Sequence, residues 1–319
     1  MQGHQADPGP LRCPSGNTGS SASGKNMQSF IYFSGVNYSP VKNLMDYESL
    51  ISDSLNYTQD ALIGKWARWA IFVIFALPFS LIRFVLDPKA LSYGSRVDWA
   101  ALPWGQIALL AGAGLVLSFF LSGYVVRVYR GVKPAPGFTE WTGLFVDGVR
   151  LEIVWIIWFL PIIVVMVAGF AAVFAALAAA HSGPGLAMLL VLFLILLFLV
   201  AMVLLLIVFL FGILGAVRFS RTGSIREGIR FSAIHAAIQA IGWGSYILAL
   251  IVYVVATIVY IIVTVFLGII PLIGWFLVLL VTPFFTIFSA RYFALVYDQG
   301  VPQTPADSEP VPQEPAPAL

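Results

Sequence analysis

The sequence predicts an all-α membrane protein with six transmembrane helices arranged in three helical hairpins. The chain of 319 residues is 60% hydrophobic and only 10% charged, whereas soluble domains contain about a quarter charged residues. Residues 153–217 and 231–290 contain no Asp, Glu, Lys or Arg. Each stretch has room for two membrane-spanning helices of about 20 residues. This composition excludes a water-soluble enzyme.

Charges and turn residues set the boundaries of the spans. Residues 181–185 contain Gly-Pro-Gly and interrupt the first uncharged stretch, and residues 268–271 end in proline and interrupt the second. Upstream, residues 104–126 form one uncharged apolar run. A weaker apolar segment begins at Trp66 and contains Pro78. The predicted spans therefore cover about residues 66–86, 104–126, 153–180, 186–217, 245–268 and 272–293.

Basic residues predict the orientation, because positively charged loops remain on the cytoplasmic side of a membrane. With the amino terminus in the cytoplasm, the opposite side contains only Arg83, Lys89 and Arg96 among the basic residues that flank the spans. We therefore expect both termini in the cytoplasm and a multi-pass protein of the plasma membrane.

Both ends of the chain differ in composition from the membrane domain at 45–298. Residues 1–44 are rich in Gly, Ser, Asn and Pro, and residues 299–319 are rich in Pro and acidic side chains. Such segments lack the apolar residues that a packed core needs, so both are predicted to be disordered tails. We expect the physiological start at Met27 or Met45.

A short segment with helical rather than continuous apolar spacing precedes each pair of spans. These segments begin at Asp46, Thr139 and Ser224. Ser224 and Glu227 match a capping box, in which each side chain binds the other residue's free backbone N–H. We therefore expect three amphipathic helices at the cytoplasmic interface. The junctions at 123–131 and 215–223 also look alike, because each has two arginines three residues apart and then a glycine.

Several segments are similar to one known family. The most distinctive block is Leu-Phe-Val-Asp-Gly-Val-Arg at 144–150. Further similar blocks are Gly123-Tyr124 with Arg127, Val128 and Arg130; Glu140-Trp141; Ser224-Ile225-Arg226-Glu227 with Phe231-Ser232; and Arg291 with Tyr297. Over about residues 45–298 the chain resembles the uncharacterised, mainly archaeal membrane family called domain of unknown function 4013. The resemblance implies the membrane architecture and brings no catalytic residues or substrate.

The residues required for catalysis or metal binding do not form a recognisable pattern. The sequence has no HExxH motif, and its one cysteine is Cys13. His181 and His235 fall on opposite predicted membrane faces and would not share a metal. We therefore expect no enzymatic activity and no cofactor. The net charge of +2 is too small to indicate nucleic-acid binding.

Seven arginines on the predicted cytoplasmic side are candidate contacts for anionic lipid headgroups, at about 1 kcal/mol each, or for a membrane protein partner. They would equally serve as ordinary topology-determining charges. Glu152 and Arg291, at predicted span ends, are interpreted as anchors in the headgroup layer. The seven candidates are Arg127, Arg130, Arg150, Arg218, Arg221, Arg226 and Arg230.

Among the predicted spans, only the fifth has a stripe of polar residues within the interior of the membrane. Tyr253, Thr257, Tyr260 and Thr264 fall on one helical face. Such groups either line a pathway or hydrogen-bond a neighbouring helix, at about 0.6 kcal/mol each.

The leading hypothesis is a non-enzymatic protein that organises lipid or a protein partner, including another copy of itself, at the cytoplasmic face. The alternative is a transporter or channel for a neutral or lipidic solute.

Overall fold

A computed structural model describes residues 45–85, 92–93, 96–97, 102–178, 184–271 and 273–300. They belong to a compact unit that begins at Met45. The predicted tail 1–44, nearly all of the predicted tail 299–319 and most of the predicted turn at 181–185 lie outside the described residues. Six helices in the described ranges are long and apolar enough to cross a membrane. The chain is therefore a multi-pass, helical membrane protein, as predicted.

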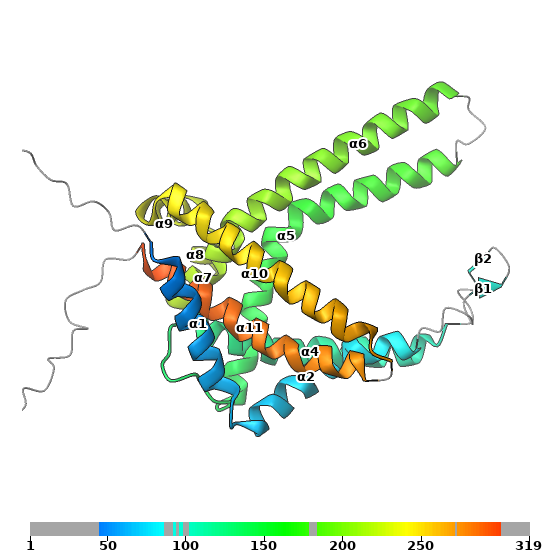
Figure 1. Ribbon diagram of the computed structural model, residues 1–319. Helices are drawn as coiled ribbons and strands as arrows, with labels where there is room; N and C mark the ends of the chain where they lie inside the picture. Colours follow the sequence, from blue (N-terminus) through cyan, green and yellow to red (C-terminus); the bar gives the residue numbers. More distant parts are fainter. Residues whose placement is uncertain are drawn as a thin grey trace, which may run out of the picture. The chain divides into compact units, whose positions relative to one another are not determined.

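The elements follow one another as α1 (Tyr47–Leu62), α2 (Trp66–Val85), β1 (Ser92–Tyr93), β2 (Arg96–Val97), α4 (Trp104–Tyr129), α5 (Trp141–Ala178), α6 (Pro184–Ile207), the π-helical segment η2 (Val208–Gly212), α7 (Ile213–Thr222), α8 (Ile225–Ile229), α9 (Phe231–Ile241), α10 (Trp243–Ile269) and α11 (Gly274–Asp298) (Figure 1). The two strands form a minimal antiparallel hairpin, which the sequence did not predict. The candidate spans are α2, α4, α5, the continuous helix α6–η2–α7, α10 and α11.

The amphipathic segment that begins at Thr139 was predicted to form an interfacial helix preceding the third span, and this prediction was wrong, because the segment is part of the span helix itself. α5 runs continuously for 38 residues, from Trp141 to Ala178. No proline or turn glycine lies between Val149 and Ile153, so nothing there ends the helix. At 1.5 Å per residue α5 is about 57 Å long, whereas the hydrocarbon core of a bilayer is about 30 Å thick. Its amphipathic first turns are therefore an extension beyond the apolar span.

Buried side chains concentrate at one end of this unit, which we call the arginine-rich end. It comprises α1, the last turns of α4, the first turns of α5, α7, α8, α9 and the last turns of α11. By contrast, α6 packs mainly along α5 (Figure 1), and most of its apolar side chains are exposed. In a membrane those side chains face lipid, which is as apolar as they are. The largest fully buried side chains include Tyr124, Tyr246, Tyr292, Phe72 and Phe219.

Two glycines bring the backbones of α4 and α5 into contact. A Cβ atom on Gly123 would lie 1.8 Å from the Leu144 carbonyl oxygen, and one on Gly148 would lie 1.7 Å from the Phe119 carbonyl oxygen. Small residues permit such close approaches between helices in membranes. This crossing fixes α5 against α4 at the arginine-rich end.

We expect Gly148→Ala to lower the free energy of unfolding by about 1–3 kcal/mol, because the added methyl group must displace the backbone of α4. The measurement is thermal unfolding in detergent, followed by circular dichroism. Gly143→Ala is the matched control on the same helix, since its Cβ would have no atom closer than 3.9 Å. That substitution should be neutral or stabilising. Equal effects of the two substitutions would contradict the close crossing.

Candidate functional site

The two similar junctions at 123–131 and 215–223 each end a helix with a glycine of positive φ. Gly131 follows α4 with φ of 80°, and Gly223 follows α7 with φ of 69°. This left-handed conformation is unfavourable for residues with a Cβ atom. The Gly223 N–H donates to the Phe219 carbonyl at 2.7 Å and terminates α7. The chain then turns into α8, which packs against α7 and α5.

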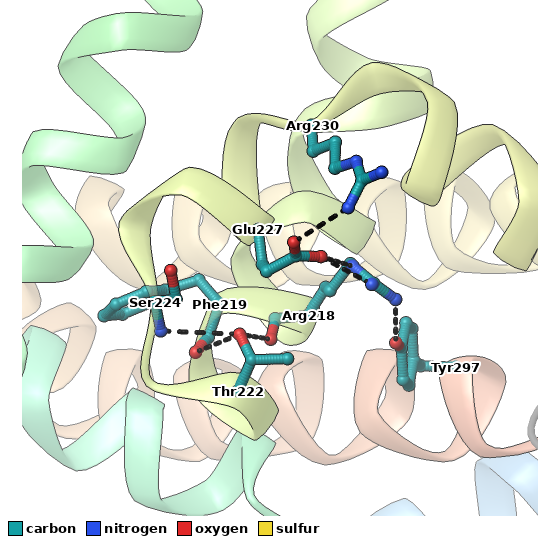
Figure 2. Close-up of polar contacts among 7 residues, drawn as sticks. All are labelled: Arg218, Phe219, Thr222, Ser224, Glu227, Arg230 and Tyr297. Carbon is teal, nitrogen blue, oxygen red and sulfur yellow. Dashed lines mark hydrogen bonds and ion pairs between the residues drawn. The ribbon is translucent and has the colours of Figure 1, made fainter.

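The Glu227 carboxylate is shared by two guanidinium groups (Figure 2). Nε and Nη2 of Arg218 donate to Glu227 Oε2 at 3.1 and 2.6 Å, and Nη1 of Arg230 donates to Oε1 at 3.2 Å. Arg218 also donates to the Tyr297 hydroxyl at 3.4 Å, so the cluster joins α7 and α8 to α11. The hydrogen bonds from Arg218, and then those from Arg230, hold the pKa of Glu227 below its usual value.

The predicted capping box is not formed. The Ser224 side chain makes no hydrogen bond to the start of α8, and the Glu227 carboxylate points to the two arginines instead (Figure 2). Charge-assisted bonds between a carboxylate and guanidinium groups are stronger than the neutral bond that a cap provides. The Ser224 backbone N–H lies 3.4 Å from the Thr222 hydroxyl.

Two further arginines tie α7 to its neighbours. Nη2 of Arg221 donates to both carboxylate oxygens of Asp298 on α11, at 2.7 and 2.9 Å. Arg130, the residue that follows α4, forms an ion pair with Asp147 on α5 at 2.8 Å. Its Nε also donates to the Ser220 carbonyl on α7 at 3.2 Å. These contacts connect four helices at the arginine-rich end.

Arg127 holds the connection between α4 and α5. Its guanidinium donates to the carbonyl groups of Thr139 and Glu140 at 2.7 and 3.2 Å. The Glu140 carboxylate lies 3.6 Å away but is largely exposed. Satisfying backbone acceptors in this way is a structural role for Arg127.

The two remaining candidates differ from the other five. The side chains of Arg150 and Arg226 are exposed. Neither makes an ion pair or hydrogen bond with any residue in the described ranges. The structure therefore brings Arg127, Arg130, Arg218, Arg221 and Arg230 into intramolecular contacts, whereas Arg150 and Arg226 have no counterion within the part of the chain that the structure describes.

Arg291 does not anchor in the headgroup layer, and that interpretation was wrong. Its residue is only 3% exposed, because α1 covers this part of α11. The guanidinium carbon lies 4.9 Å from the ring centre of Tyr57, a cation–π arrangement. Burial raises the pKa of Tyr57 to about 12, although Arg291 acts in the opposite direction. No sequence signal linked Tyr57 to this arginine.

Glu152, the other predicted anchor, accepts a hydrogen bond from the Ser122 hydroxyl and so joins α5 to α4. Ser122 on α4, the second span, therefore supplies a hydrogen-bond donor to the Glu152 carboxylate near the crossing of α4 and α5.

The polar stripe of α10 makes its interhelical bonds to α11. The Tyr253 hydroxyl donates to Ser289 at 3.3 Å, and the hydroxyls of Tyr260 and Thr282 are 3.2 Å apart. Thr257 and Thr264 bond to carbonyls of α10 itself. The Tyr260 ring stacks on Phe285 with 4.2 Å between centroids. This geometry fits helix packing.

The model of a family described as "Protein of unknown function (DUF4013)" matches residues 107–272, from α4 to the end of α10. The match includes all seven candidate arginines and the polar stripe. No curated protein and no solved structure matches the chain.

We expect Glu227→Gln to lower the thermal unfolding midpoint in detergent, because the neutral amide loses the charge-assisted bonds to Arg218 and Arg230. A lowered pKa in the folded state stabilises the protein fully above the usual glutamate pKa of about 4.3, and this stabilisation is lost as pH falls through the lowered value. The difference between the wild type and the variant should therefore be largest at neutral pH and disappear in acid.

Glu140→Gln is the control for that experiment, because the Glu140 side chain is 84% exposed and should contribute little. A pH-independent effect of Glu227→Gln would contradict the ionic role of Glu227.

We expect Tyr260→Phe to reduce stability by about 0.6 kcal/mol, because it removes one interhelical hydrogen bond and keeps the stacked ring. Unfolding in detergent measures this change. Thr264→Val should have a smaller effect, since the Thr264 hydroxyl bonds only to its own helix. If Tyr260→Phe left stability unchanged and altered solute flux in vesicles, the stripe would line a pathway instead.

Proposed function

The chain belongs to the DUF4013 family of proteins of unknown function, and we propose that it is a non-enzymatic membrane protein that organises anionic lipid. In this proposal the arginine-rich end lies at the cytoplasmic face of the plasma membrane, and both termini are cytoplasmic. The single observation behind it is the pair of exposed arginines, Arg150 and Arg226, that have no counterion among the described residues.

The charges around α7 and α8 support this proposal. α7, α8 and the residue after α8 carry Arg218, Arg221, Arg226 and Arg230, and within the described residues these four arginines form ion pairs with two carboxylates, those of Glu227 and Asp298. The paired arginines hold the helices together, and the excess positive charge stays at the surface. Basic side chains near a membrane surface attract anionic headgroups at about 1 kcal/mol each.

The surroundings of these arginines also favour lipid as the ligand. Arg150 is on α5 and Arg226 on α8, and α8 packs against α5 close to where the apolar part of α5 begins. A long arginine side chain near the start of this apolar part can extend along the protein surface until its guanidinium contacts headgroup phosphates. The bonds from Tyr253 and Tyr260 to α11 support packing of the polar stripe, so transport has no comparable observation in its favour.

The test is the amount of anionic phospholipid that stays bound when the protein is purified in mild detergent, quantified by mass spectrometry. We expect the double variant Arg150→Gln/Arg226→Gln to weaken retention by about 30-fold, since two contacts of about 1 kcal/mol are lost. The charge-preserving double variant Arg150→Lys/Arg226→Lys is the control and should retain lipid as the wild type does, because it keeps both positive charges.

Equal lipid retention by the double variant and the wild type would overturn the proposal. A stoichiometric protein that co-purifies with the wild type and is lost from the double variant, with lipid retention unchanged, would replace the lipid role with a protein partner.

A further inference from the structure

An apolar groove runs between α5 and α6 and ends under α8. It has a volume of about 210 Å³ and is lined by apolar and tryptophan side chains. α5 contributes Trp158 and Pro161, α6 contributes Leu204 and Ile207, and α8 contributes Ile229. Since α5 and α6 are candidate membrane spans, the groove opens towards acyl chains.

Two irregularities in the helices explain why α5 and α6 do not close together here. Pro161 removes one backbone hydrogen bond from α5 and displaces the preceding turn. On the opposite wall, the π-helical segment η2 begins at Val208, which also lines the groove. A π-helical turn inserts an extra residue and shifts the side chains that precede it relative to those that follow. Side chains of the two helices therefore lose their regular interdigitation at this level.

α8 carries an exposed arginine, Arg226, one turn before Ile229, the α8 residue that lines the groove. Arg226 and Ile229 are three residues apart, so they lie on neighbouring positions of one helix face. Glu227, the nearest carboxylate in sequence, is already bound by Arg218 and Arg230. The Trp158 indole N–H donates to the Gly228 carbonyl at 3.1 Å and holds α8 over α5. This bond holds the backbone of α8 in place, with Ile229 in the wall of the groove and Arg226 one turn earlier on the same helix.

We propose that this groove binds one acyl chain of an anionic phospholipid whose phosphate group contacts Arg226. The inference rests on the proposed function and assigns it a single site. Charge complementarity identifies the occupant, because Arg226 requires an anion and the groove requires hydrocarbon. A phospholipid provides both within one molecule, whereas a free phosphate provides only the first. A peptide segment would bring unpaired backbone groups into an apolar groove.

A second apolar groove on the same helix pair provides an internal control. It has a volume of about 450 Å³ and is lined by residues that include Trp155, Phe159, Met202 and Leu206. No residue of α8 is among those that line it. A lipid in this second groove would not be placed against Arg226 by α8.

The experiment is native mass spectrometry of the purified full-length protein in detergent, titrated with phosphatidylglycerol or with phosphatidylcholine of the same chains. We expect one phosphatidylglycerol to bind more tightly than phosphatidylcholine. Arg226→Gln should reduce this preference by about fivefold, the equivalent of about 1 kcal/mol. Leu204→Trp fills the groove and should weaken binding of both lipids, whereas Leu206→Trp in the second groove should leave both unchanged.

The outcomes separate the site from the general role. If Arg226→Gln abolishes the preference but Leu204→Trp and Leu206→Trp behave alike, the groove assignment is overturned and the proposed function stands. If the wild type shows no preference for phosphatidylglycerol, both are overturned. Binding of glycerol phosphate as tight as that of phosphatidylglycerol would identify a free phosphate as the source of the anion and overturn the lipid site. Because Arg226 is exposed, its substitution tests the proposal even if Leu204→Trp does not fold.

Discussion

α5 and the continuous helix α6–η2–α7 are each longer than a bilayer is thick, and the rest of the arginine-rich end depends on that excess length. The 38 residues of α5 extend about 57 Å, against a hydrocarbon core of about 30 Å. The helical segments that extend beyond the hydrocarbon core of the bilayer need protein partners for their apolar faces. α4 meets α5 through Gly123 and Gly148, and α8 folds back onto α7 and α5. The buried core therefore lies where the chain leaves the apolar layer.

This position of the core explains the roles of most of the arginines. Helices that pack close to the headgroups bring partly exposed carboxylates of different helices next to arginines, and charge-assisted bonds form between them. Arg218 and Arg230 satisfy Glu227, Arg221 binds Asp298, and Arg130 binds Asp147. These arginines stabilise contacts between helices that are distant in sequence. The exposed Arg226 is free to contact a ligand because its neighbour Glu227 is occupied.

The candidate site could be predicted only in part from the sequence. Arginines at span ends are visible as charges in the sequence, so the seven could be named as candidates. Whether each has a partner depends on residues far along the chain, such as Asp298 for Arg221 and Ser220 for Arg130. The groove under α8 was not predicted, because apolar residues in a span look alike whether they face lipid or a cavity. Pro161 was the one visible signal of irregular packing there.

The sequence by itself determined that the chain is a helical, multi-pass membrane protein, because two uncharged stretches long enough for paired spans admit few other folds. It also determined the family, through blocks such as that at 144–150. Only the tertiary structure decided that this block continues into α5 without a break, that Arg291 is buried against Tyr57, and that Ser224 forms no cap. Hydropathy and charge are local properties, whereas burial and ion pairing depend on which distant segments come together.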